Sequence, residues 1–149
     1  MNSQPTLLTE RLRLRSLTRD DAGPIKTLAA SPEVRQFSDP IPASYQPEQV
    51  EAWIGALAQR FTAGQEAAFA IELHETGDVA GVANLVLNAA HQRGELGYWL
   101  GRPYWGHGYA TEAARAMLRY GFEQLRLHRI FANYIGRNAA SGRVLEKAG

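Results

Sequence analysis

Apolar side chains recur along the chain with two spacings, and each spacing predicts a different kind of element. Leu12 and Leu14 alternate with arginines, which is typical of a strand with one buried face. Residues 50–61 carry apolar side chains at three- and four-residue steps, which predicts an amphipathic helix. The chain therefore starts with a strand, and its first strongly periodic helix follows about forty residues later.

The segments between these two elements hold helix-start signals. Thr18 is a candidate N-cap with Asp21 three residues on, but Pro24 leaves open whether this helix starts at Thr18, starts near Pro24 or kinks there. Ser31 followed by Pro32 predicts a short second helix. The proline-rich stretch 37–45 is expected to be a loop.

A hairpin is predicted downstream of the long helix. Phe69, Ile71 and Leu73 alternate with small or polar residues, and residues 75–78 (Glu-Thr-Gly-Asp) have the composition of a tight turn. Residues 79–87 form the return strand, in which Gly81 indicates a bulge.

The last third of the chain alternates strands and helices. A strand is expected over 94–100, then a glycine-bearing turn, then a helix whose apolar face runs from Ala110 to Leu125. Residues 129–135 predict a further strand, and residues 139–148 a further helix. This is a mixed α/β order with antiparallel strands first and a strand–helix–strand crossover later, in one domain over residues 1–149.

The turn before the long C-terminal helix has the makings of an anion site. Gly106 and Gly108 flank His107, so the backbone can turn tightly and a ligand can approach the main chain. The free N–H groups at the helix start point into the turn, and the helix dipole adds a positive potential there. A phosphate or diphosphate is the ligand best matched to such a site.

Two familiar phosphate loops do not fit this turn. A P-loop needs a lysine and then Ser or Thr after its last glycine, whereas Tyr109 follows Gly108. The dinucleotide fingerprint needs three glycines with a wider spacing.

The stretch from Trp105 to Ala110 (Trp-Gly-His-Gly-Tyr-Ala), preceded by residues 97–100 (Gly-Tyr-Trp-Leu), resembles the acetyl-coenzyme A loop of the GNAT superfamily of N-acetyltransferases, in its RimJ/RimL-like branch. Trp105 stands where that loop usually has Gln or Arg. Residues 8–15 resemble the first strand of the branch, and residues 138–149 resemble its Asn-x-x-Ser segment and following helix.

The resemblance implies a fold and a cofactor site. It implies a mixed, mostly antiparallel central sheet with helices on both faces and two strands splayed into a central V. It places acetyl-CoA along the backbone of Tyr98, Trp99 and Leu100 and places its diphosphate on the turn. The turn residues concerned are Trp105, Gly106, His107, Gly108, Tyr109, Ala110 and Thr111. Asn138 would contact the pantetheine arm. By their position and charge, Arg143 and likewise Arg102 and Arg137 are candidates to meet the 3′-phosphate, or else are solvated surface residues.

The resemblance also implies a mechanism in which an amine attacks the thioester directly. Glu95 is the candidate base, and its alternative role is a surface residue at a strand end. Ser141 is the candidate acid for the leaving thiolate, or else a helix N-cap partner of Asn138. Tyr134 is a weaker candidate acid, and a packed core tyrosine is its favoured alternative role. Glu112, one turn into the helix, is interpreted as structural because a negative charge favours a helix N-terminus.

Composition narrows the function classes. Lys and Arg number 16 against 15 Asp and Glu, and this balance argues against a nucleic-acid partner. Cysteine is absent, which excludes disulfides, thiolate metal sites and a cysteine nucleophile, and the four histidines are too scattered to indicate a metal. No apolar run has the length of a membrane span and no signal region is recognised, so a cytoplasmic protein is expected.

The favoured function is therefore transfer of an acetyl group from acetyl-CoA to an amine, with a protein N-terminal α-amine as the first choice of acceptor. Three alternatives remain open: a small-molecule amine as acceptor, an acyl-CoA-binding module without turnover, and an ATP-binding domain. Relative to the family, a final strand pair is expected to be missing after Gly149. Residues 129–135 would then be an exposed strand edge able to pair with another chain, which makes a homodimer an open alternative.

Overall fold

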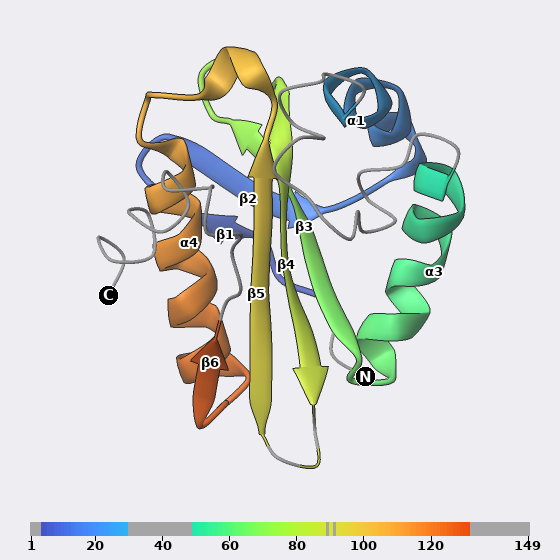
Figure 1. Ribbon diagram of the computed structural model, residues 1–149, viewed down its shortest axis with the longest axis vertical. Coiled ribbons are helices and arrows are strands. Elements are labelled where there is room, and N and C mark those ends of the chain that lie inside the picture. Colours follow the sequence, from blue (N-terminus) through green and yellow to red (C-terminus); the bar gives the residue numbers. More distant parts are fainter. Residues whose placement is uncertain (1–3, 30–48, 89, 91, 132–149) are drawn as a thin grey trace.

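The structure, a computed structural model, describes residues 4–29, 49–88, 90 and 92–131. Its sheet has six strands whose order in space is their order in the chain (Figure 1). The strands are β1 (Leu7–Leu8), β2 (Leu12–Ser16), β3 (Glu66–Leu73), β4 (Val79–Asn88), β5 (Arg93–Leu100) and β6 (Arg129–Phe131). The helices are α1 (Ala22–Ala29), α3 (Val50–Thr62) and α4 (Tyr109–Arg119). Shorter helical turns are η1 (Arg19–Asp21), η5 (Arg102–Tyr104) and η6 (Tyr120–Gln124).

The sheet is mixed. Neighbouring strands are antiparallel from β1 through β5, and β6 runs parallel to β5. The amphipathic helix predicted over residues 50–61 is α3, and the predicted hairpin is the β3–β4 pair. The mixed α/β class and the mostly antiparallel sheet are therefore confirmed.

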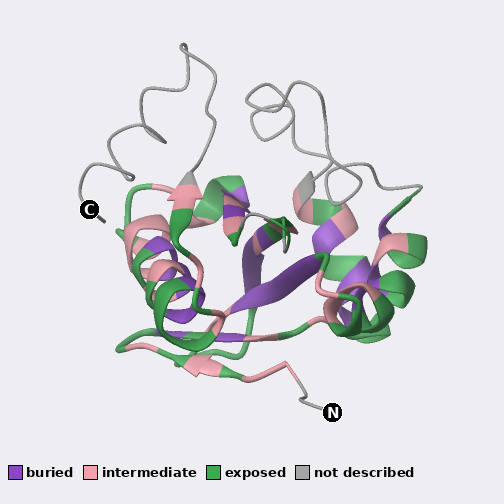
Figure 2. Cartoon of the chain, turned by 90° about the horizontal axis from the view of Figure 1, so that it is seen from below, coloured by how far each residue is buried: buried purple, intermediate pink, exposed green. Residues whose placement is uncertain are grey.

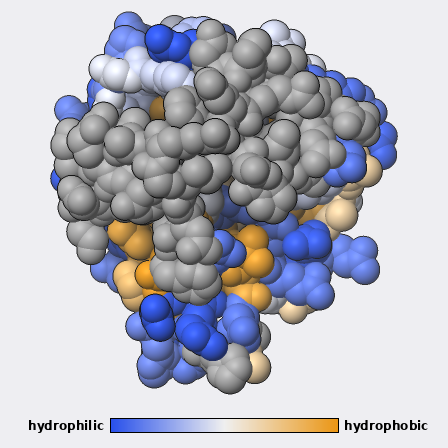
Figure 3. Space-filling model, in the orientation of Figure 1, coloured by the Kyte–Doolittle hydropathy of each residue, from blue (hydrophilic) through white to orange (hydrophobic). Residues whose placement is uncertain are grey.

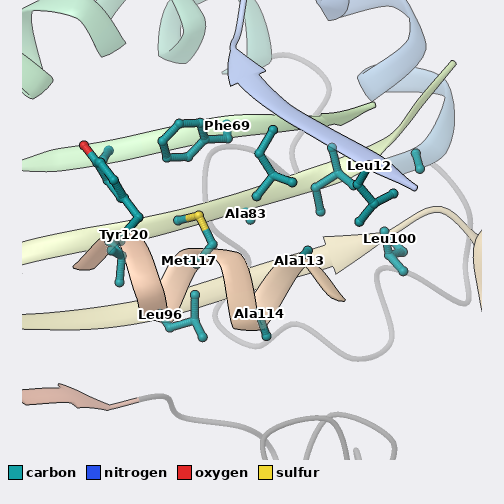
Figure 4. Packing of buried hydrophobic residues seen from close by; sticks show 14 residues of the cluster. Leu12, Phe69, Ala83, Leu96, Leu100, Ala113, Ala114, Met117 and Tyr120 are labelled. Atoms are coloured by element: carbon teal, nitrogen blue, oxygen red, sulfur yellow. The ribbon is translucent and has the colours of Figure 1, made fainter. Parts of the chain in front are cut away.

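Helices cover both faces of the sheet, so the two faces bury two apolar clusters (Figures 1 and 2). On one face, α4 packs its buried side chains onto the strands (Figure 4). That cluster includes Ala113, Ala114, Met117, Tyr120, Phe69, Leu85, Leu96 and Leu100. On the other face, α1 and α3 pack against β4 and β5 through Ile25, Val50, Ile54, Val82 and Trp99. The alternation of side chains along each strand assigns successive residues to these two faces.

The first helix begins with a tighter turn than either predicted start. Asp21 Oδ2 accepts a hydrogen bond from the Thr18 N–H at 2.7 Å, and η1 leads directly into α1 at Ala22. Pro24 is the third residue of α1, where a missing N–H costs little because the first turn has no intrahelical acceptors for its donors. The helical segment therefore starts from the Thr18 cap, as one alternative predicted, and Pro24 neither starts nor breaks the helix.

Gly81 lies beside an irregularity in the β3–β4 ladder, as predicted. Ile71 pairs with Gly81 while Glu72 pairs with Val79, so Ala80 is the extra residue of a bulge. A Cβ atom on Gly81 would lie 2.0 Å from the Trp99 carbonyl oxygen. Glycine at this position therefore lets β4 approach the end of β5 closely.

The last long helix differs from its prediction. Its α-helical part ends at Arg119, and residues Tyr120–Gln124 form a π-helical turn in which the Leu125 N–H donates to the Tyr120 carbonyl at 3.1 Å. A Cβ atom on Gly121 would lie 2.5 Å from Ile130 Cδ1. The wider turn thus presents a glycine to β6 and lets that strand approach the helix end.

The described pairing of β6 with β5 registers Arg129–Phe131 against Arg93–Glu95. The rest of the strand predicted over 129–135 lies outside the described residues, and so do the helices predicted at Ser31 and over 139–148. The central V expected between these two strands therefore stays a prediction.

Asp21 ties the first helical segment to the sheet. Its carboxylate accepts two hydrogen bonds from the Arg15 guanidinium at 2.8 and 2.9 Å, while Arg15 Nε donates to Glu72 at 2.9 Å. Burial of Asp21 raises the pKa of its carboxyl, but the hydrogen bonds from Arg15 and Thr18 together lower it by more. The net pKa of Asp21 therefore lies below its ordinary value. The ionised carboxylate is therefore the form that stabilises the fold.

Replacing Asp21→Asn is expected to lower the free energy of unfolding at pH 7 by about 1–3 kcal/mol, because charge-assisted hydrogen bonds to Arg15 are lost. A carboxyl whose pKa is lowered by folding stabilises the protein above its unfolded-state pKa, and this contribution disappears as the pH falls. Urea unfolding should therefore show the gap between wild type and Asp21→Asn closing below about pH 4. The exposed neighbour Asp20→Asn is the control, and a gap that stays constant in acid would contradict this role.

Candidate functional site

The turn between β5 and α4 has the backbone that its two glycines predict. Gly106 has φ 82° and Gly108, the N-cap of α4, has φ 81°. Residues with side chains rarely adopt this left-handed conformation, so both positions favour glycine. Gly106, His107 and Gly108 are exposed, and a Cβ atom on Gly106 would meet no atom within 4 Å. The turn is therefore open to a ligand on the Gly106 side.

The start of α4 supplies amide donors next to this turn. The first intrahelical hydrogen bond runs from the Glu112 N–H to the Gly108 carbonyl at 3.2 Å. The N–H groups of Tyr109, Ala110 and Thr111 precede it and so have no acceptor within the helix. These residues are half-buried, and the positive end of the helix dipole lies at the same point. The arrangement suits an anion, as the sequence predicts.

Trp105 turns its indole ring back onto the protein. Its Nε1–H donates to the Leu100 carbonyl at 2.8 Å, and the Arg102 guanidinium lies over the ring at 4.7 Å from its centre. The side chain that replaces Gln or Arg in the loop pattern thus closes η5 against the end of β5. Its predicted contact with the cofactor stays a prediction.

The opposite side of the turn is held by the β1–β2 connection. Arg11 Nη1 donates to the His107 carbonyl at 2.8 Å, and Arg11 Nε donates to Glu112 Oε1 at 2.7 Å. Glu112 Oε2 also accepts hydrogen bonds from the Arg11 backbone N–H, at 2.7 Å, and from the Thr9 hydroxyl. The Arg11 guanidinium lies 4.7 Å from the centre of the Tyr109 ring. Two segments about one hundred residues apart in sequence are joined here.

Glu112 is the ionised partner in this cluster. Burial raises the pKa of its carboxyl, but the hydrogen bonds from Thr9 and Arg11 together lower it by more. The net pKa of Glu112 therefore lies below its ordinary value. The structural interpretation of Glu112 from the sequence agrees with this position. The contribution of Thr9 and Arg11 was missed, although both lie in the segment that resembles the family's first strand. The sequence holds no local signal for this pairing, because the two partners lie 101 residues apart along the chain.

Glu95 lies near the other end of β5. Alternation along the strand puts Glu95, Gly97 and Trp99 on the face that α1 and α3 cover. Glu95 is half-buried, and Val86, its partner on β4, is 42% exposed. Figure 3 shows apolar surface over the lower part of the sheet, bordered by hydrophilic residues at the bottom. The candidate base therefore lies beside accessible sheet surface.

Tyr98, Trp99 and Leu100 complete β5 between Glu95 and the turn. Trp99 and Leu100 are buried on opposite faces of the sheet, and Tyr98 is half-buried. All three pair with β4 in the register Ala83, Val82 and Gly81. At a rise of about 3.3 Å per residue, roughly 17 Å of extended strand connects Glu95 to Leu100.

His107 contributes to the turn through its backbone carbonyl. Its exposed ring lies 5.4 Å from that of Tyr109. In the part of the chain that the structure describes, no group of three or more His, Cys, Asp or Glu side chains could hold a metal ion. Within the same residues, no helix is both long and apolar enough to cross a membrane.

Four predicted site residues lie outside the described residues: Tyr134, Asn138, Ser141 and Arg143. The structure brings the turn, the start of α4 and the length of β5 together at one side of the sheet. The structure does not test Ser141 or Tyr134 as the proton donor, nor the cofactor contacts expected from Asn138 and Arg143.

Comparison with known proteins gives the same family as the site. The sequence pattern of the acetyltransferase (GNAT) domain matches residues 11–149. The uncharacterized N-acetyltransferase p20 of Bacillus licheniformis is 34% identical over 141 residues, which cover 94% of this chain and 79% of p20. The ribosomal protein uS5-alanine N-acetyltransferase of Escherichia coli (strain K12) is 30% identical over 105 residues, which cover 69% of this chain and 54% of that protein.

A solved structure shows the shared fold. RimL, a ribosomal L7/L12 α-N-protein acetyltransferase in complex with coenzyme A, superposes with a TM-score of 0.84 at 16% identity. The superposition covers 97% of this chain and 82% of RimL. Together with the family match over residues 11–149, these similarities show that the chain belongs to the GNAT family of N-acetyltransferases and is an acyltransferase enzyme.

Proposed function

We propose that this enzyme transfers the acetyl group of acetyl-CoA to the N-terminal α-amine of a protein. The observation that carries the donor side is the exposed turn with two left-handed glycines, which opens onto the amide donors of α4. The acceptor side rests on the relative in Escherichia coli that is named for acetylating an alanine of ribosomal protein uS5.

The turn is the proposed holder of the diphosphate. The amides of Gly108, Tyr109, Ala110 and Thr111 offer several N–H donors within one helical turn, where charge-assisted hydrogen bonds to an anion are stronger than neutral ones. The backbone of Tyr98, Trp99 and Leu100 lies between this turn and Glu95 and is the proposed track for the pantetheine arm. Asn138 and Arg143 are the proposed further contacts to the cofactor.

Glu95 is the proposed base. Acetyl-CoA supplies an activated acyl group, and the chain has to hold an uncharged amine against it. In the transfer, the amine nitrogen forms a bond to the acyl carbon, the carbon–sulfur bond breaks, and the amine gives up a proton. A half-buried carboxylate on the α1/α3 face can take that proton, directly or through a water molecule. Ser141, with Tyr134 as the weaker choice, is the proposed donor of a proton to the departing thiolate.

Gly106→Glu is expected to weaken coenzyme A binding by more than about tenfold, because it adds bulk and a negative charge where the diphosphate is proposed to bind. Gly77→Glu is the matched control, since Gly77 has φ 77°, also has open space around it, and lies in the β3–β4 turn. Both variants carry a similar backbone strain, so only a ligand contact separates them. Titration calorimetry measures the affinities. Equal affinity of the two variants would refute the placement of the diphosphate.

Glu95→Gln is expected to lower kcat/KM for the amine by roughly 100-fold or more and to flatten the acidic limb of the pH–rate profile, because the proton acceptor is removed. Coenzyme A affinity should change little. The exposed Glu123→Gln, on η6, is the control. An acidic limb that survives in Glu95→Gln would assign the base to another group.

The acceptor is tested with pairs of peptides that differ only in a blocked N-terminus and carry the same lysines. Thiol release from acetyl-CoA and mass spectrometry of the products should show acetylation of the free N-terminus and none of the blocked partner. Amino acids, polyamines and aminoglycosides are assayed in parallel. Turnover with one of these small amines, and none with any free peptide, would replace the protein N-terminus as acceptor.

A further inference from the structure

The side of the glycine turn that faces the β1–β2 connection is held by a compact polar cluster, which we call the Arg11–Glu112 latch. It consists of Thr9 and Arg11 from that connection, Glu112 of α4, and the carbonyl group of His107. The distances are 2.8 Å from Arg11 Nη1 to the His107 oxygen and 2.7 Å from Arg11 Nε to Glu112 Oε1. One guanidinium therefore bonds the turn and the helix at the same time.

The His107 carbonyl determines where an amide of the turn points. A trans peptide unit is planar, so the carbonyl of His107 and the N–H of Gly108 lie on opposite sides of it. Because Arg11 holds the carbonyl, the Gly108 N–H is directed away from Arg11. Gly108 at φ 81° and the nearby Gly106 at φ 82° give this peptide backbone freedom that a bulkier residue would not have. Without the hydrogen bond, the peptide could rotate and withdraw its N–H.

Arg11 is in turn fixed by Glu112. The carboxylate takes both the Nε–H and the backbone N–H of Arg11, and the Thr9 hydroxyl donates to the same oxygen as the backbone N–H. The guanidinium also lies over the Tyr109 ring, and a Cβ atom on Gly108 would lie 3.2 Å from Arg11 Nη2. The Arg11 guanidinium therefore passes close behind Gly108.

We propose that Arg11 and Glu112 are positioning residues that hold the His107–Gly108 peptide in the orientation that presents the Gly108 N–H to the diphosphate of acetyl-CoA. This inference rests on the proposed diphosphate site. Arg11 acts through the carbonyl it binds, and its charge is balanced by Glu112. The latch therefore sets the geometry of the anion site from behind.

The charge of Glu112 makes the inference sharply testable. A carboxylate near an anion site repels the anion, so Glu112→Gln would strengthen coenzyme A binding if only charge mattered. If Glu112 holds Arg11, the same substitution loosens the turn and weakens binding. We expect a fall in coenzyme A affinity of about 10- to 100-fold, which corresponds to loss of one hydrogen bond to a charged group.

Arg11→Lys separates position from charge in the same way. Lysine keeps the positive charge but cannot reach Glu112 and the His107 carbonyl with a planar fork. We expect Arg11→Lys to bind coenzyme A as weakly as Glu112→Gln. Binding at wild-type strength would show that charge alone is required and would overturn the latch.

The experiment measures coenzyme A affinity by calorimetry for wild type, Glu112→Gln, Arg11→Lys and the exposed control Glu123→Gln, each checked for folding by circular dichroism. Steady-state kinetics compare acetyl-CoA with S-acetylpantetheine, which lacks the diphosphate. The latch predicts a raised KM for acetyl-CoA with kcat nearly unchanged, and no change in kcat/KM for S-acetylpantetheine. Equal losses with both donors, or lower thermal stability with normal coenzyme A affinity, would overturn it.

The Gly106→Glu variant distinguishes failure of the latch from failure of the site. If Gly106→Glu weakens coenzyme A binding and Glu112→Gln does not, the site stands and the latch is wrong. If neither substitution weakens binding, the diphosphate lies elsewhere, and both the proposed site and the latch are wrong.

Discussion

The packing of α4 on the sheet is the constraint on which the rest of the site depends. Ala113, Ala114 and Met117 are buried against the strands, and the two alanines let the helix backbone lie close to the sheet. This packing fixes the direction of the helix axis, and it thereby fixes the position of the free N–H groups in the first turn of α4. The helix start is held at the end of β5 with its donors accessible, which neither the helix nor the turn could achieve alone.

The strand β5 connects the two ends of the proposed reaction. The turn and α4 start follow Leu100, whereas Glu95 lies five residues earlier on the face covered by α1 and α3. β4 pairs along the whole of β5, and Gly81 allows its backbone to come close to Trp99. A continuously paired strand holds the glycine turn and Glu95, the two proposed ends of the reaction, at a fixed separation, which is what acyl transfer between two bound reactants requires.

Family membership and individual residues answer different questions here. The match to GNAT acetyltransferases covers residues 11–149 and establishes the reaction class. In this chain, two hydrogen bonds hold the turn in place: Trp105 donates to the Leu100 carbonyl, and Arg11 donates to the His107 carbonyl. The acceptor depends on side chains and loops that vary between members of a fold, so the fold alone does not identify it.

The sequence by itself determined several of the elements and the position of the glycine turn between β5 and α4. Period-two and period-3.6 patterns identified β2, β3 and α3, and the glycines at 106 and 108 marked the turn, because these signals are local properties of the chain. Only the tertiary structure decided that α4 turns π-helical at Tyr120, where β6 comes close to Gly121, and that Pro24 falls inside a capped first turn. Only the tertiary structure joined Arg11 to Glu112, since a hydrogen bond between residues about a hundred positions apart depends on how the strand and the helix are packed and leaves no periodic trace in the sequence.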